Sequence, residues 1–163
     1  MSTAVLSIGS NLGDRLATLQ CAVDALRDWI VTISPVYETP PWGPVPQDDY
    51  LNAVLIVSDA TAAPSDWLAR GQRAEQAAGR TREVRWGPRT LDVDVVAVDD
   101  VRSADPVLTL PHPRAAERAF VLVPWLAADP SAELAGVPVR QLVAALPADE
   151  VAGVRRRAEL DLR

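Results

Sequence analysis

The sequence predicts an α+β fold in which strands and helices alternate over the first hundred residues. Short runs rich in β-branched residues and bounded by Gly or Pro recur along the chain and are typical of strands. Between them lie two segments whose apolar residues follow the spacing of a helix. The predicted order is strand, helix, strand, strand, helix, strand, which is the βαββαβ order of a ferredoxin-like core.

The first strand is predicted at residues 3–8, which form an apolar run closed by Gly9. The helix after it has apolar residues at alternating steps of four and three, so that they line one face. These residues are Leu12, Leu16, Leu19, Val23, Leu26 and Ile30. Asn11 and Asp14 are the two candidates for its N-cap.

Two further strands are predicted at residues 31–37 and 51–57, on either side of a loop at residues 39–50. Four prolines exclude a regular sheet ladder inside this loop. A second helix is predicted from Pro64, because proline fits the first turn of a helix.

The second helix directs Trp67, Leu68, Ala74 and Ala78 toward the core, and Gly71 costs it up to about 1 kcal/mol. The last strand of the core is predicted at residues 90–98, which alternate strictly between two faces. After it, proline-rich stretches and short apolar segments predict additional C-terminal loops and short helices.

Length and composition narrow the function classes. The 163 residues predict a single domain over residues 1–163, which we expect to be monomeric. A net charge of −6 disfavours nucleic-acid and anionic-membrane partners. All basic residues are Arg, so any phosphate recognition uses guanidinium groups. Because the chain has one Cys and one His, a disulfide framework and the usual zinc sites are excluded. The sequence shows neither an apolar run long enough to span a membrane nor a signal sequence, so we expect a cytoplasmic protein.

Asp92 and Asp94 are the first candidate site residues. In a strand they share one face, with Cα atoms about 6.6 Å apart, while Leu91, Val93 and Val95 face the other way. Two carboxylates on one strand face are either an exposed sheet surface or a platform for magnesium, which prefers carboxylate, water and phosphate oxygens.

Arginines precede this strand in a dense block at positions 80, 82, 85 and 89. Taken alone, four arginines are better explained as a solvated loop. Beside two carboxylates, on an acidic chain, they suggest a bounded phosphate pocket. Trp86 lies inside this block, which could form a lid over a nucleotide.

Other candidates lie in loops. His112 is held between two prolines and could donate to a phosphate oxygen, although a lone loop histidine is usually exposed. Tyr50 and Phe120 could enclose a flat heterocycle between two rings, and Asn52 could bind the edge of such a ring. The arginine run at residues 155–157 is more readily explained as a solvated chain end than as a nucleic-acid arm.

Taken together, these motifs resemble the 6-hydroxymethyl-7,8-dihydropterin pyrophosphokinase family of folate biosynthesis. The matching segments are residues 9–13, 37–43, 49–52, 79–80, 85–96 and 110–113, followed by Arg118 and Phe120. They occur in order from about Ala4 to Trp125, and the segment 85–94 is highly specific.

The resemblance implies transfer of pyrophosphate from ATP to the hydroxymethyl group of the pterin, with two Mg²⁺ ions on Asp92 and Asp94 and a ferredoxin-like core. Implied catalytic residues are Arg80, Arg82, Arg89, Asp92 and Asp94. Implied ATP-binding residues are Gln72, Glu75, Arg80, Arg82, Trp86, Arg89, Val95, Thr109, His112 and Arg118. Implied pterin-binding residues are Thr39, Pro40, Trp42, Tyr50, Asn52, Asp92 and Phe120.

Three other functions remain open on the sequence. A two-metal nucleotidyl cyclase or polymerase-palm-like enzyme would share the core and the carboxylates, but would release pyrophosphate. An RNA-recognition sheet would need surface aromatics and a basic face, whereas the central strands are aliphatic and the chain is acidic. A catalytically inactive ligand-binding domain would be expected to have lost some of these charged positions.

Overall fold

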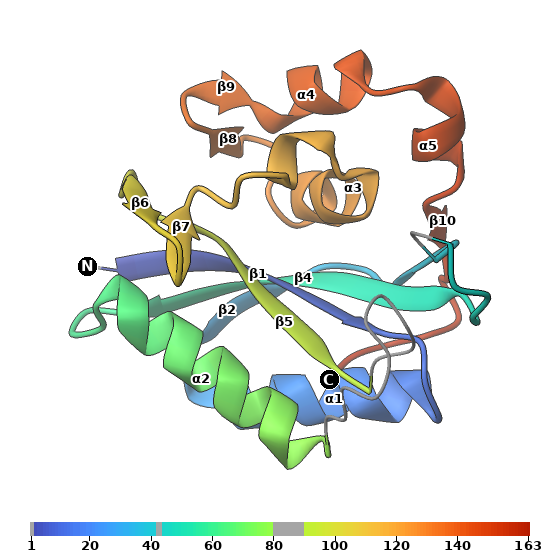
Figure 1. The fold of residues 1–163 in the computed structure, drawn as a ribbon, viewed down its shortest axis with the longest axis horizontal. Helices are drawn as coiled ribbons and strands as arrows, with labels where there is room; N and C mark the ends of the chain where they lie inside the picture. The colour runs from blue at the N-terminus through green and yellow to red at the C-terminus, as the bar shows by residue number, and fades with distance from the viewer. Residues whose placement is uncertain (1, 42–43, 80–89) are drawn as a thin grey trace.

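The computed structural model describes residues 2–41, 44–79 and 90–163. At its centre is an antiparallel sheet of long and short strands, with helices on both faces (Figure 1). Helices α1 (Arg15–Leu26) and α2 (Pro64–Ala77) cover one face, and α3 (Ala119–Ala128) covers part of the other. The strands of the sheet are β1 (Ser2–Ser10), β2 (Ile30–Ile33), β3 (Tyr37–Thr39), β4 (Tyr50–Asp59), β5 (Asp92–Val98) and β10 (Arg155–Arg156).

Short elements complete the chain. They are the 3₁₀ turns η1 (Arg27–Trp29) and η2 (Ala115–Glu117), the hairpins β6 (Ser103–Asp105) with β7 (Leu108–Leu110) and β8 (Glu133–Leu134) with β9 (Val137–Pro138), and helices α4 (Val139–Ala145) and α5 (Ala148–Ala152). Among the described residues, no helix is both long and apolar enough to cross a membrane.

The strand order confirms the predicted ferredoxin-like core. The main path runs β10-β3-β4-β1-β5, and β2 also pairs with β4. In the ferredoxin-like core, β1 is the first strand, β2 and β3 together form the second, β4 is the third and β5 is the fourth. Across the sheet these core strands lie in the order second, third, first, fourth, and every neighbouring pair is antiparallel. The βαββαβ order of the sequence therefore folds into the four-stranded arrangement that it predicts.

The single strand predicted at residues 31–37 is wrong, because β2 ends at Ile33 and β3 begins at Tyr37. Between these strands, Ser34 forms two hydrogen bonds with the backbone of Val54. Its hydroxyl accepts the Val54 N–H at 2.8 Å, and its own N–H donates to the Val54 carbonyl at 2.9 Å. Pro35 follows and has no N–H to contribute. A side chain thus substitutes for backbone pairing where the strand bends.

The strict alternation predicted for residues 90–98 is wrong beyond Val95. Leu6 pairs with Val95 but Val5 pairs with Ala97, so Val96 is an extra residue, a β-bulge. Its carbonyl accepts the backbone N–H of His112 at 2.8 Å. The bulge therefore ties the loop that carries His112 to the edge strand.

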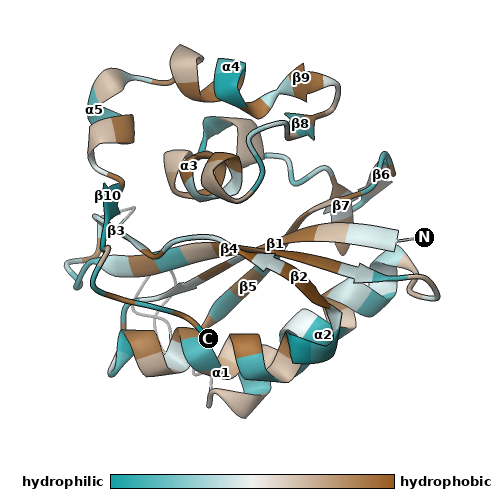
Figure 2. Ribbon diagram, turned by 180° about the vertical axis from the view of Figure 1, so that it is seen from behind, coloured by the Kyte–Doolittle hydropathy of each residue, from teal (hydrophilic) through white to brown (hydrophobic). Residues whose placement is uncertain are grey.

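Each face of the sheet has its own apolar core. Figure 2 shows that strands of the sheet and helix α3 are rich in hydrophobic residues. Leu6, Ile8 and Trp67 are fully buried on the α1 and α2 side, and Val54 and Leu122 on the α3 side.

Gly71 in α2 is explained by this packing. A Cβ at Gly71 would lie 2.9 Å from Val93 Cγ1. Its helix-weakening effect is therefore offset by a closer approach of α2 to β5.

Asp14, rather than Asn11, caps α1: its carboxylate accepts the Ala17 N–H at 3.1 Å. Gly13 before it has φ +68°, a conformation that favours glycine. Asn11 instead donates to Gln47 Oε1 at 2.8 Å and to the Asp48 carbonyl at 2.9 Å. The turn after β1 is thereby fastened to the loop that precedes β4.

Candidate active site

The sheet register places candidate residues of three strands in one row. Asn52 of β4 lies opposite Gly9 of β1, and Gly9 lies opposite Asp92 of β5. In the next row on this face, Ser7 stands between Val54 and Asp94. Since Val5, Val54 and Val96 of the same face pack under α3, the carboxylates and Asn52 lie on the α3 side of the sheet.

Gly9 leaves space in the middle of the first row. A Cβ there would lie 2.9 Å from Asn52 Oδ1 and 3.5 Å from Tyr50 Cδ1. The side chains of β4 thus lean over β1, which only a glycine permits. Sequence reasoning treated Gly9 as the end of a strand and missed this role, although glycine inside a strand signals close approach of another group.

Asn52 is held rigidly by Thr39. Its Nδ2 donates to Thr39 Oγ1 at 2.6 Å, and both residues are buried. Thr39 also pairs with Tyr50 in the β3–β4 ladder. Three predicted pterin contacts, Thr39, Tyr50 and Asn52, are therefore held together, and Pro40 follows at an exposed position.

The carboxylate pair has the predicted orientation. Leu91, Val93 and Val95 belong to the core beneath α2, while Asp92 and Asp94 are partly exposed on the other face. Among the described residues, no cluster of three or more His, Cys, Asp or Glu could hold a metal. Two hard carboxylates fit the way Mg²⁺ binds when phosphate oxygens and water supply its other ligands.

Arg118, the residue before α3, lies between Asp94 and the ring of Phe120. Its Nη1 is 3.9 Å from Asp94 Oδ2, and its guanidinium carbon is 5.5 Å from the centre of the Phe120 ring. A cation that faces both groups can bind an anionic ligand beside a stacked one.

His112 is fixed in one tautomer. Its Nδ1 accepts the Arg114 N–H at 3.2 Å, so in the neutral ring Nε2 carries the proton and is the available donor. Burial lowers the pKa of His112, and the charges of Arg118 and Arg114 lower it further, against the opposing effect of Asp94. The lowered pKa favours the neutral imidazole, in which Nε2–H is available as a donor.

Four of the residues predicted to bind ATP differ from one another in burial and in hydrogen bonding. Gln72 is exposed on α2, and Val95 is buried in the core beneath that helix. Glu75 is buried, and its Oε2 accepts the Val93 N–H at 3.1 Å, which fastens α2 to β5. Thr109 lies on β7 and donates to the Asp105 carbonyl at 2.9 Å. Their assignment to ATP stays a prediction.

The remaining predicted residues lie outside the described part of the chain. They are Trp42, Arg80, Arg82, Trp86 and Arg89, and with them the whole arginine block.

The fold and this face define a class: a ferredoxin-like α+β protein with paired carboxylates on an edge strand, an arrangement suited to metal-dependent transfer of phosphoryl groups. A family model described as 7,8-dihydro-6-hydroxymethylpterin-pyrophosphokinase matches residues 5–130. The chain belongs to this family.

Curated relatives agree over most of the chain. A 2-amino-4-hydroxy-6-hydroxymethyldihydropteridine pyrophosphokinase of Mycobacterium tuberculosis is 52% identical over an alignment 163 positions long, which covers 91% of this chain and 87% of the relative. A protein of the same name from Methylorubrum extorquens is 42% identical, with 90% and 94% covered.

A solved structure has the same fold. The HPPK-DHPS protein of Plasmodium falciparum superposes with a TM-score of 0.68 at 14% sequence identity, over 88% of this chain. This chain spans 44% of that chain, less than half of its length.

Proposed function

We propose that the protein transfers pyrophosphate from ATP to the hydroxymethyl group of 6-hydroxymethyl-7,8-dihydropterin, giving AMP and the pterin diphosphate, a step of folate biosynthesis. The observation that carries the proposal is membership of the pyrophosphokinase family over residues 5–130. The row of Asn52, Gly9 and Asp92 supports it, because it puts a group suited to a pterin edge beside a carboxylate suited to the reacting end.

We place the pterin subsite around the row formed by Asn52, Gly9 and Asp92. Asn52, oriented by Thr39, binds the polar edge of the ring, and Tyr50 and Phe120 stack on its faces. Pro40 and Trp42 complete the subsite, and Asp92 lies toward the hydroxymethyl group.

ATP is proposed to bind beside the carboxylates. His112 donates from Nε2 to a phosphate oxygen, and Arg118 neutralises phosphate charge. Arg80, Arg82 and Arg89 contact the transferring phosphates, and Trp86 covers them. Gln72, Glu75, Val95 and Thr109 take the nucleotide side.

Asp92 and Asp94 would hold two Mg²⁺ ions, which when bound neutralise charge on the triphosphate. In the reaction, the pterin hydroxyl oxygen forms a bond to the β-phosphorus, and the bond from this phosphorus to the oxygen that leaves with AMP breaks. We propose Asp94 as the group that receives the hydroxyl proton. We further propose that the protein acts on these small molecules as a cytoplasmic monomer, without nucleic acid or membrane partners.

The test is AMP formation from ATP and magnesium, with and without the pterin. AMP that appears only with the pterin, with equal pterin diphosphate, supports the proposal. Release of pyrophosphate would favour a cyclase-like or polymerase-like enzyme, and the absence of both products from folded protein would contradict the proposal.

A further inference from the structure

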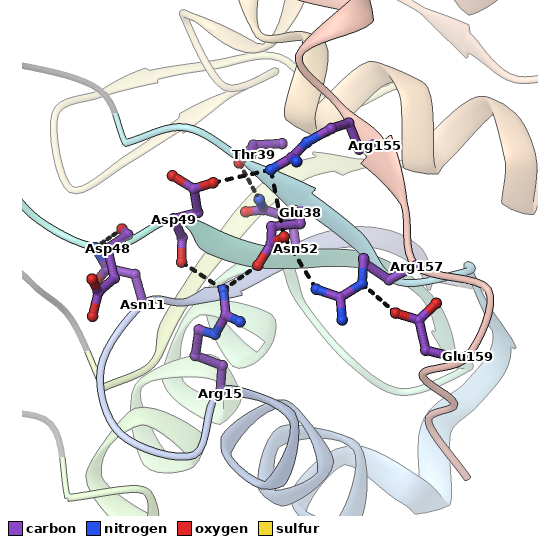
Figure 3. A network of polar contacts seen from close by, with 10 residues as sticks. All are labelled: Asn11, Arg15, Glu38, Thr39, Asp48, Asp49, Asn52, Arg155, Arg157 and Glu159. Carbon is purple, nitrogen blue, oxygen red and sulfur yellow. Dashed lines mark hydrogen bonds and ion pairs between the residues drawn. The ribbon is translucent and has the colours of Figure 1, made fainter.

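The arginines of the C-terminal segment belong to the main sheet. Strand β10 pairs with β3, with Arg155 opposite Glu38 and Arg156 opposite Tyr37, and the Arg157 N–H donates to the Val36 carbonyl at 2.8 Å. Arg155 and Arg156 are exposed, in line with the prediction of a solvated chain end. That prediction did not include the pairing with β3 or the ion pairs that the side chains of Arg155 and Arg157 form (Figure 3).

Glu38 is the centre of these ion pairs. Its Oε2 lies 2.6 Å from Arg15 Nη1, and its Oε1 lies 3.1 Å from Arg157 Nη1 and 3.4 Å from Arg155 Nη2. The Glu38 side chain is only 14% exposed. Burial by itself raises the pKa of Glu38, but the hydrogen bond from Arg15 and the charges of the three arginines lower it to below its usual range.

The same arginines hold the end of the loop before β4. Arg155 Nη2 lies 3.0 Å from Asp49 Oδ2, and Arg15 Nη1 donates to the Asp49 carbonyl at 2.9 Å. Arg157 also pairs with Glu159. We call Arg15, Glu38, Asp49, Arg155, Arg157 and Glu159 the Glu38 network; its three positive and three negative charges balance.

This network borders the residues proposed to bind the pterin. Glu38 lies in β3 directly before Thr39, and Asp49 lies directly before Tyr50. Thr39 in turn orients Asn52. A shift of β3 or of the loop end would move Thr39, Tyr50 and Asn52 together.

We propose that Glu38, through Arg15, Arg155 and Arg157, is a positioning residue for the pterin subsite, so that the C-terminal segment contributes to substrate recognition. This inference rests on the proposed function. It gives the C-terminal arginines a role that neither their exposure nor their position at the end of the chain indicates.

Glu38→Gln and Arg155→Ala test the proposal. Either change weakens the hold on β3 and on the loop end, so we expect the KM for the pterin to rise tenfold or more, the KM for ATP to change less than twofold, and kcat to fall less than the KM rises. When Glu38→Gln and Arg157→Ala are combined, the KM for the pterin should rise by less than the product of the two single fold-changes, because both substitutions break the same ion pair.

Arg27→Ala is the matched control. Arg27 and Gln20 hold the carbonyl of Arg163 at the other end of the same C-terminal segment, away from β3. This variant should keep the wild-type KM for both substrates.

Hydrogen exchange provides a readout that does not need the reaction. In Glu38→Gln and Arg155→Ala, the amides of Thr39, Tyr50 and Asn52 should exchange faster, while those of β1 stay protected. An inactive wild type would overturn the proposed function but leave this readout intact. Unchanged exchange together with an unchanged KM for the pterin, in Arg155→Ala if Glu38→Gln does not fold, would overturn the positioning role.

Discussion

Replacing Gly9 with Ala should selectively weaken pterin binding. The new methyl group would lie 2.9 Å from Asn52 Oδ1 and 3.5 Å from Tyr50 Cδ1. Asn52 cannot turn away without loss of its 2.6 Å hydrogen bond to Thr39, which lies in a buried environment. Leaving one such buried group without its partner costs about 1–3 kcal/mol.

We expect the pterin to bind only the Thr39-bonded orientation of Asn52, so that a free energy of this size is paid again on binding. It would then appear as a rise of about 5- to 150-fold in the KM for the pterin, at about 1.4 kcal/mol for each factor of ten. The assay is AMP formation at saturating ATP over a range of pterin concentrations, with direct pterin binding measured by calorimetry. The KM for ATP should change little, since the clash is in β4 and β1 and not at the carboxylates.

Gly71→Ala is the control for a general loss of stability. Its methyl group would also lie 2.9 Å from a neighbour, Val93 Cγ1, but on the opposite face of the sheet. It should lower the Tm without a selective rise in the KM for the pterin. If Gly9→Ala bound the pterin like the wild type, Gly9 would not border the pterin subsite.

Three further predictions follow from the proposed roles. Asp94→Asn should reduce kcat by orders of magnitude while ATP affinity, measured by calorimetry, changes far less; normal turnover would remove Asp94 from the reaction. Phe120→Ala should raise the KM for the pterin about fivefold or more and spare that for ATP, because it removes a stacking ring; an unchanged value for the pterin would show that Phe120 only packs. Since the folded-state pKa of Glu38 is lowered, Glu38 stabilises the fold above its unfolded pKa of about 4.3, and this contribution is lost as the pH falls through the folded value. Denaturant melts at pH 7 and pH 3 should therefore show a smaller acid loss of stability in Glu38→Gln than in the wild type, and an equal loss would refute the linkage.

Much of the fold could be predicted from the sequence because its signals are local. The apolar residues of α1 recur at helical spacing, and Leu91, Val93 and Val95 alternate with Asp92 and Asp94 within one strand. The break at Ser34 and the bulge at Val96 could not be predicted, since both depend on partner strands far along the chain.

By itself, the sequence determined the order of the elements, the face shared by Asp92 and Asp94, and the family to which the chain belongs. Only the tertiary structure decided that Gly9 lies between Asn52 and Asp92, because register is a relation between strands. The same holds for Glu38 and Arg157, which are 119 residues apart. The spacing of charged residues along a sequence does not indicate which of them form ion pairs, so this contact can be identified only in the folded chain.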